Sequence, residues 1–205
     1  MEIGDYFHYN NNTMKNEKPV HMTSLSGELL VLKTHGRIEF RGVIDTLEAE
    51  VIEAQVLAAH QAGGAGSAES WICGCLGEIL DYLRALMAAE VKETPLAPPF
   101  LFGKDAGELH RLSHQPFPRG AGGGGFQLPS YTQGPLAARL NTLRAKVREA
   151  ELLSVRVFGP GDISRGTNPA GGEEINERED IILALNRLSS ALWWLYCEYI
   201  TIITR

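Results

Sequence analysis

The clearest helical pattern in the chain is the run PLAARLNTLRAKVREAELLSVRVF at residues 135–158. Its apolar side chains recur at steps of three and four residues, which is the period of an amphipathic helix. The positions that this pattern turns inward are Leu136, Leu140, Leu143, Val147, Ala150, Ser154 and Val157. A helix with one apolar face buries it against other elements, so neighbouring helices are expected.

Similar patterns on both sides of this run predict the remaining helices, and no segment shows the period-2 alternation of a strand. The expected helices begin near Gly42, Glu69, Asp105 and Arg178, and the first ends at the run GGAGS of residues 63–67. The predicted fold is therefore all-α, an antiparallel bundle of four or five helices. Residues 1–20, polar and rich in asparagine, are expected to form a flexible arm before a single helical domain at 21–205. Two Gly/Pro-rich loops, around 118–135 and 159–172, flank the run at 135–158.

The composition excludes several classes of protein. The 205 residues carry 19 Lys and Arg against 25 Asp and Glu, a formal charge of −6, whereas a general nucleic-acid binder needs a basic excess. No stretch is apolar enough for a membrane span, and the beginning of the chain carries no readable secretory signal. Three cysteines cannot form a closed disulfide framework, which suits a reducing compartment. A cytoplasmic location is expected.

A basic stripe is the first candidate for chemistry. Arg144, Arg148 and Glu151 lie at i, i+4 and i+7 of the run at 135–158, so their side chains share one helix face. Arginine forks match phosphate oxygens, and such a stripe in an acidic protein would suit a polyphosphate. A solvated face with intrahelical ion pairs has the same pattern, and the spacing leaves both interpretations open.

Other candidates are weaker. Asn186 and Ser190 lie beside a strongly apolar helix face, where a ribose, a base or a neighbouring helix would satisfy them. His110 and His114, four residues apart, have a spacing that allows shared metal ligation, but no third ligand follows at a fixed offset. Cys73 and Cys75 are expected to act as small packing residues. Core or subunit contacts are expected for the aromatic residues Trp193, Trp194, Tyr196 and Tyr199.

Five segments together resemble the corrinoid adenosyltransferases of the ethanolamine-utilization type and, more distantly, those of the propanediol-utilization type. They are KPVHMTSL (18–25), HGRIEFRGVIDTLEAEVIEAQVLA (35–58), GELHRLSHQP (107–116), LPSYTQGPLAARLNTLRAKVREAELLSVRVF (128–158) and REDIILALNRLSSALWWLY (178–196). The resemblance implies a helical bundle, commonly a homotrimer with active sites between subunits. It also implies transfer of the 5′-deoxyadenosyl group of ATP to cob(I)alamin, with release of triphosphate. Mg²⁺ is expected to accompany the ATP.

The resemblance also assigns roles to individual residues. Arg144 would bind the phosphates of ATP, and Arg148 would pair across the subunit boundary with Asp45 of GVIDTLEAE. Phe126 would pack against the lower face of the corrin, where an apolar group displaces the axial base and makes the Co(II) form easier to reduce. The positions that match the ATP-binding and supporting residues of the family are Thr23, Ser24, Lys33, Arg37, Glu151 and Asn186.

The chain also departs from the family pattern. The glycine-rich phosphate loop of the propanediol type is replaced by Met22-Thr23-Ser24-Leu25, and the N-terminal cysteine cluster of some ethanolamine-type members is missing. No structural iron or zinc is expected. The partners expected are a reductase and a cobalamin-dependent lyase such as ethanolamine ammonia-lyase. A non-catalytic corrinoid-binding or delivery protein and a purely structural helical adaptor are the alternatives, and the sequence leaves enclosure in a bacterial microcompartment open.

Overall fold

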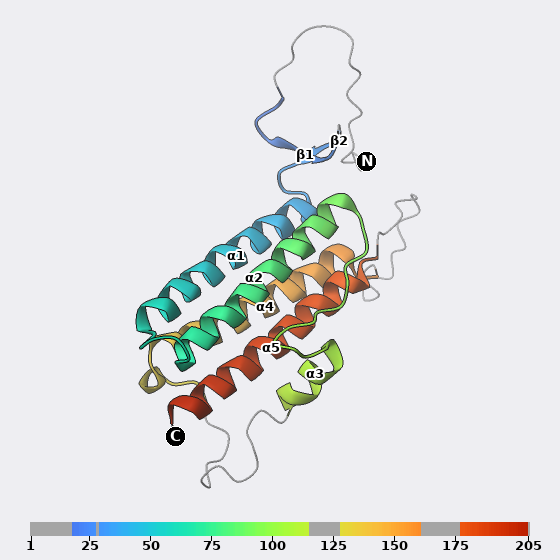
Figure 1. Cartoon of the computed structure of the whole chain (residues 1–205). Coiled ribbons are helices and arrows are strands. Elements are labelled where there is room, and N and C mark those ends of the chain that lie inside the picture. Colours follow the sequence, from blue (N-terminus) through green and yellow to red (C-terminus); the bar gives the residue numbers. More distant parts are fainter. Residues whose placement is uncertain (1–17, 28, 115–127, 161–176, 205) are drawn as a thin grey trace, which may run out of the picture.

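Four long helices form an antiparallel bundle in the computed structural model, which describes residues 18–27, 29–114, 128–160 and 177–204 (Figure 1). They are α1 (Gly36–Gln61), α2 (Ala68–Lys92), α4 (Pro135–Phe158) and α5 (Glu179–Ile203). The order around the bundle is α1, α2, α5, α4, because α1 packs on α2 and α4 while α5 packs on α4 and α2. The short helix α3 (Ala106–His114) lies against α5. The predicted all-α bundle is confirmed.

The core forms where the apolar faces of the four helices meet. The apolar residues that recur at helical spacing along α2 are all fully buried, namely Ile72, Leu76, Ile79, Leu83 and Leu86. The inward positions predicted for α4 are buried as well, except that Val157 is half-buried. Phe40 of α1 packs edge-on against Phe158 of α4, with 5.0 Å between ring centroids. Each buried Leu or Phe side chain contributes about 1.5–3 kcal/mol to the free energy of folding.

A small hairpin precedes the bundle, and the expectation that the chain has no strands is wrong here. Strands β1 (Met22–Ser26) and β2 (Leu29–Leu32) pair in antiparallel fashion. The two strands are so short that they bury only Leu25 and Val31, too few positions for an alternation to stand out in the sequence. Gly27, in the turn, has φ 52°, a left-handed conformation that favours glycine.

Helix α1 begins six residues earlier than the sequence pattern predicts, at Gly36 instead of Gly42. Its N-cap is His35, whose side chain accepts a hydrogen bond from the N–H of Arg37 at 3.2 Å. Histidine is not among the preferred N-cap residues, so the sequence carries no recognisable start signal. Phe40, fully buried, extends the apolar face of α1 backward by one turn.

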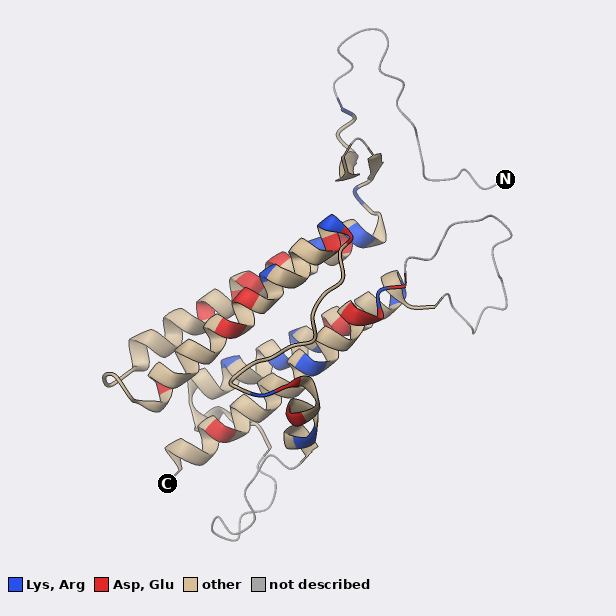
Figure 2. Cartoon of the chain, turned by 45° about the vertical axis from the view of Figure 1, so that its right-hand side comes forward, with Lys and Arg blue, Asp and Glu red and all other residues tan. Residues whose placement is uncertain are grey.

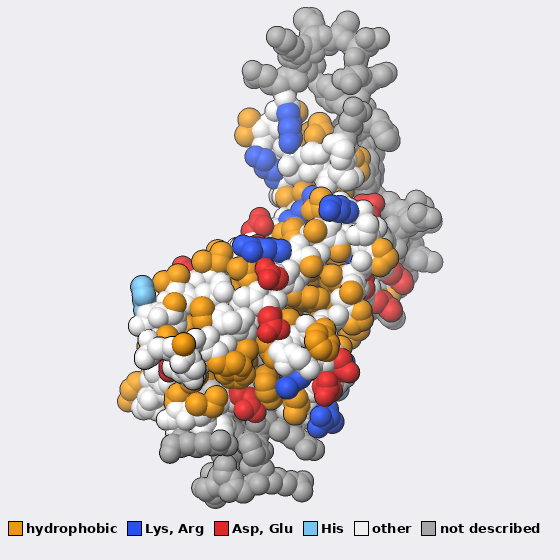
Figure 3. Space-filling view, viewed as in Figure 1, with side chains coloured by type: hydrophobic (Ala, Val, Ile, Leu, Met, Phe, Trp, Pro, Cys, Tyr) orange, Lys and Arg blue, Asp and Glu red, His pale blue; other side chains and the backbone are white. Residues whose placement is uncertain are grey.

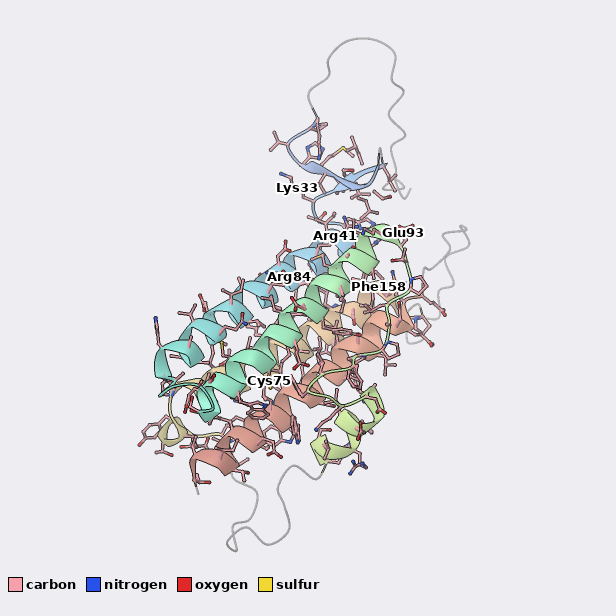
Figure 4. The ribbon with its side chains drawn as sticks, viewed as in Figure 1. Lys33, Arg41, Cys75, Arg84, Glu93 and Phe158 are labelled. Carbon is pink, nitrogen blue, oxygen red and sulfur yellow. The ribbon has the colours of Figure 1, made fainter. Side chains whose placement is uncertain are left out.

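An ionic cluster joins the hairpin to the bundle. Glu90 of α2 has no exposed side-chain surface and lies 2.5 Å from Nε of both Arg37 and Arg41. Arg37 also pairs with Glu93 through Nη1 at 2.7 Å, and Arg41 donates from Nη1 to the carbonyl oxygen of Leu25 in β1 at 2.8 Å. Figure 4 shows Arg41 and Glu93 at this junction, and Figure 3 shows basic and acidic side chains side by side there. The position of the hairpin therefore depends on buried charges of α1 and α2.

None of the helices within the described residues has both the length and the apolar character that a membrane-spanning segment requires.

Candidate functional site

Helix α3 begins with a reciprocal side-chain cap, and apolar contacts hold it along α5. The N–H of Glu108 donates to Oδ1 of Asp105 at 2.8 Å, and the N–H of Asp105 donates back to Oε2 of Glu108 at 3.2 Å. This reciprocal cap satisfies N–H groups that the start of a helix leaves unpaired. Phe102 stacks on Trp194 of α5 with 5.7 Å between ring centroids, and Leu109 is fully buried. The remaining face of α3 is left to line a pocket.

This pocket, called here the α3–α5 pocket, has a volume of about 510 Å³. Its wall consists of His110, Ser113 and His114 of α3, Leu128 and Pro129 of the segment before α4, Arg144 and Arg148 of α4, and Asn186, Ser189, Ser190 and Trp193 of α5. Arg144, Arg148 and Asn186 are residues that the sequence analysis selected. The pocket thus receives two cations from α4 and several neutral hydrogen-bonding groups from α3 and α5.

Arg144 is held in place on one side and open on the other. Its Nε and Nη2 both donate to Oδ1 of Asn141, at 3.2 and 3.1 Å. The guanidinium carbon lies 5.4 Å from the ring centroid of Trp193, which in turn stacks on Tyr196. Nη1 has no hydrogen-bond partner among the described residues. A guanidinium fixed in this way offers its open edge to an anion at little cost in side-chain entropy.

Arg148 is exposed in the wall of the pocket and has neither a hydrogen bond nor an ion pair within the described part of the chain. The surrounding helix is basic, since α4 carries five Lys and Arg residues against two Glu, whereas acidic residues outnumber basic ones on α1 and α2. Figure 2 shows this separation of charge along the bundle. The net charge of −6 therefore conceals a local positive region suited to a small polyanion.

Asn186 is fixed by partners on both sides of its amide. Its Nδ2 donates to Oε1 of Glu151 on α4 at 2.7 Å, and its Oδ1 accepts from Nη1 of Arg187 at 2.7 Å. Glu151 does not line the pocket but orients a residue that does. The two residues that the sequence analysis selected separately thus form one contact between α4 and α5.

The two histidines of α3 form the outer edge of the pocket. Their rings meet edge-on with 4.6 Å between centroids, and Nδ1 of His110 lies 3.1 Å from Nη1 of Arg187. The cation of Arg187, with smaller effects of desolvation and of His114, lowers the pKa of His110 below its ordinary value. Across the described residues, no group of three or more His, Cys, Asp or Glu side chains is arranged to hold a metal ion.

Several predicted site residues lie away from the α3–α5 pocket of their own chain. Asp45 is exposed on α1, and Thr23 and Ser24 belong to β1. Lys33 is exposed just after β2, on the hairpin side of the junction in Figure 4. Arg37 has all three guanidinium nitrogens occupied by the ionic cluster at Glu90 and Glu93. One chain does not bring these residues to the pocket, and their predicted roles stay predictions.

Phe126 lies outside the described residues, so its predicted place under the corrin stays a prediction too. Two parts of the site were missed by the sequence analysis. Trp193, expected in the core or in a subunit contact, is half-buried in the pocket wall, and Asn141 holds Arg144. A signal for Asn141 existed, because residues three apart on a helix are neighbours.

Comparisons with known proteins agree with the sequence resemblance. A model of the family described as Cobalamin adenosyltransferase matches residues 14–199. The chain is 34% identical over 177 residues to the corrinoid adenosyltransferase EutT of Salmonella typhimurium, and equally so to that of Escherichia coli K12. These alignments cover 86% of the chain but 58% of each relative, so the chain spans little more than half their length. No solved structure matches at a comparable level of significance.

Proposed function

The chain belongs to the cobalamin adenosyltransferase family, and from this premise we propose that it transfers the 5′-deoxyadenosyl group of ATP to the cobalt of cob(I)alamin. The electron pair of Co(I) forms the cobalt–carbon bond, the C5′–O bond of ATP breaks, and triphosphate leaves with the electron pair of that bond. The nucleophile belongs to the corrinoid substrate. The protein then contributes positioning, exclusion of water and stabilisation of the charge that develops on the leaving triphosphate.

The observation that carries this proposal is the pair of arginines in the α3–α5 pocket. Arg144 keeps Nη1 open, and Arg148 has no partner among the described residues. Two guanidinium groups with open N–H donors in one cavity match the oxygens of a triphosphate. Asn186, held by Glu151 and Arg187, adds a fixed amide to the same wall, suited to the nucleoside part of the ligand.

We infer that the rest of the site comes from a neighbouring subunit of a homotrimer. Asp45 is exposed on α1, and Arg148 is exposed and forms no ion pair with any carboxylate among the described residues. The two are therefore open to pairing across a subunit boundary. In the same arrangement Thr23, Ser24 and Lys33 would approach ATP from the partner's hairpin. Arg37 would do so only by giving up Glu93, the exposed member of its cluster.

The corrinoid is proposed to bind beside the nucleotide, with Phe126 against its lower face. Leu128 and Pro129, which follow Phe126 closely in the sequence, line the pocket and give its rim apolar surface. Mg²⁺ is proposed to enter with ATP, held mainly by the triphosphate and by water. No step of the reaction proposed here passes through the metal. The adenosylcobalamin formed would serve a cobalamin-dependent lyase, and ethanolamine ammonia-lyase is the candidate that the resemblance favours.

The test compares Arg148→Ala with Arg156→Ala, a matched exposed arginine on the same helix that does not line the pocket. With ATP and chemically reduced cobalamin, the wild-type protein is expected to form adenosylcobalamin and inorganic triphosphate. Removing one charge-stabilising donor typically lowers turnover by about 100-fold or more, so Arg148→Ala should fall by that factor while Arg156→Ala keeps its rate. Equal rates in the two variants would remove Arg148 from the mechanism.

The same assay separates the alternatives. A corrinoid-binding or delivery protein would change the cobalamin spectrum on binding but show no further change when ATP is added. A structural adaptor would bind neither ligand, so its melting temperature would not rise with ATP or cobalamin, whereas a ligand that binds only the native state must raise it.

A further inference from the structure

A chain of hydrogen bonds crosses three helices at the wall of the α3–α5 pocket. Nδ1 of His110 on α3 lies 3.1 Å from Nη1 of Arg187 on α5. The same Nη1 donates to Oδ1 of Asn186 at 2.7 Å, and Nδ2 of Asn186 donates to Oε1 of Glu151 on α4 at 2.7 Å. These four residues, called here the histidine relay, link the outermost helix to the basic helix of the bundle.

Each hydrogen bond of the relay has a fixed direction from donor to acceptor. A guanidinium only donates hydrogen bonds and does not lose its proton in proteins. Nδ1 of His110 must therefore be the acceptor, which places the proton of the neutral ring on Nε2. Both hydrogens of Nη1 are used, one by His110 and one by Asn186. The amide of Asn186 is consequently oriented with its oxygen toward Arg187 and its nitrogen toward Glu151.

The surroundings of His110 favour the unprotonated ring that this arrangement needs. Arg187 of α5 contacts His110 directly, and the titratable or charged groups that line the pocket with it are His114 of α3 and Arg144 and Arg148 of α4. All of them are cations or can become so, and the lowered pKa of His110 agrees with this balance. A protonated ring would lose its acceptor and would repel Arg187.

We propose that His110 is a positioning residue, which holds Arg187 and through it the side-chain amide of Asn186 in the orientation that meets the ligand of the pocket. It touches neither of the proposed reacting atoms. Protonation of His110 would release Arg187, and the amide of Asn186 would lose one of the two partners that fix it. The consequence for ligand binding rests on the proposed function, under which this ligand is ATP, but the relay itself does not depend on it.

The relay is tested first without any ligand, by following the histidine nitrogens and the side-chain amide of Asn186 by NMR between pH 5 and 8. We expect His110 to carry its proton on Nε2 and the Asn186 amide signals to shift with the midpoint of the His110 titration. His110→Asn keeps an acceptor near the place of Nδ1 but cannot titrate, so in this variant the pH-dependent shift should vanish. A proton on Nδ1, or Asn186 signals that ignore the titration, would overturn the proposal whatever the enzyme does.

The second arm measures kcat and KM for ATP in wild type, His110→Asn, His110→Leu and the control Arg111→Leu, an exposed neighbour on α3 outside the pocket. Losing a hydrogen bond to a charged group should raise KM about tenfold in His110→Leu, with kcat little changed. The KM of wild type should rise on acidification, and that of His110→Asn should not. Equal pH profiles in these two proteins would overturn the role in ATP binding, whereas a wild-type protein without any turnover would instead refute the proposed function.

Discussion

Replacing Glu90 with glutamine is expected to destabilise the protein by about 3–5 kcal/mol, because it removes a fully buried carboxylate that reaches Nε of both Arg37 and Arg41. The Glu90 side chain is fully buried, and the side chains of Arg37 and Arg41 are 14% and 16% exposed. Glutamine has nearly the same shape, so no cavity forms. Its amide nitrogen would face an arginine donor, Arg41 would lose its counter-charge, and Arg37 would keep only the exposed Glu93.

A matched control comes from the same cluster. Glu93 pairs with Arg37 at 2.7 Å but is 46% exposed. An ion pair at the surface typically contributes 0.2–1 kcal/mol, so Glu93→Gln should cost about 1 kcal/mol or less. Both variants remove a carboxylate that pairs with Arg37, and the two sites differ in that Glu90 is fully buried and also reaches Arg41. Replacing the triad of Glu90, Arg37 and Arg41 together by Leu and Met should restore most of the lost stability, since apolar residues of similar volume often replace buried ion pairs without loss.

The assay is chemical and thermal denaturation at one fixed protein concentration, because the stability of an oligomer depends on it. For a chain of this size, 1 kcal/mol corresponds to roughly 2–4 °C, so Glu90→Gln should lower Tm by about 6–20 °C and Glu93→Gln by a few degrees at most. If the two single variants melt within about 2 °C of each other, burial does not govern this cluster, and its proposed part in fixing the hairpin would have to be abandoned.

Two further predictions follow from the environments of titratable groups. Desolvation raises the pKa of Asp180, but hydrogen bonds from Arg178 and from backbone N–H groups lower it by more, so the net pKa lies below the ordinary value of 3.8. The contribution of Asp180 to the stability of the folded state is therefore present above pH 3.8 and is lost as the pH falls through the lowered pKa. Asp180→Asn should therefore be less stable than wild type at pH 7, and the difference should shrink below pH 4. Burial raises the pKa of Cys75 and of Cys197 to about 12, so only the half-buried Cys73 should react rapidly with a thiol reagent at pH 8. Rapid reaction of all three cysteines in the native protein would contradict the observed packing.

The sequence predicted the long helices because each repeats its apolar pattern over several turns, as α2 does from Ile72 to Leu86. Prediction failed where the signal is short or chemically unusual. The hairpin buries one residue on each strand, and α1 is capped by His35, a residue type that does not mark helix starts. In both places tertiary contacts, such as the bond from Arg41 to the carbonyl of Leu25, determine the local structure.

The candidate site divides in the same way. Arg144 and Arg148 were predictable because one turn of one helix brings them together, and helical spacing can be read from the sequence. The relay could not be predicted, since His110 and Arg187 are 77 residues apart and meet only because α3 packs on α5. The spacing of His110 and His114 suggested metal ligation, but the pairing of His110 with a cation could not be read from that spacing.

Arginine has two opposite roles in this chain, which differ in how many guanidinium nitrogens donate hydrogen bonds to the protein. At the hairpin junction every guanidinium nitrogen of Arg37 donates a hydrogen bond, two to the carboxylates of Glu90 and Glu93 and one to the backbone carbonyl of Glu90, whose side chain is fully buried. In the α3–α5 pocket Arg144 is held along one edge only, and Arg148 has no partner among the described residues. Acidic residues outnumber basic ones on α1 and α2, while α4 has more cations than carboxylates. An acidic protein can therefore neutralise the arginines of a structural cluster and still leave guanidinium N–H groups open in a pocket, which is why the net charge alone does not predict what the pocket binds.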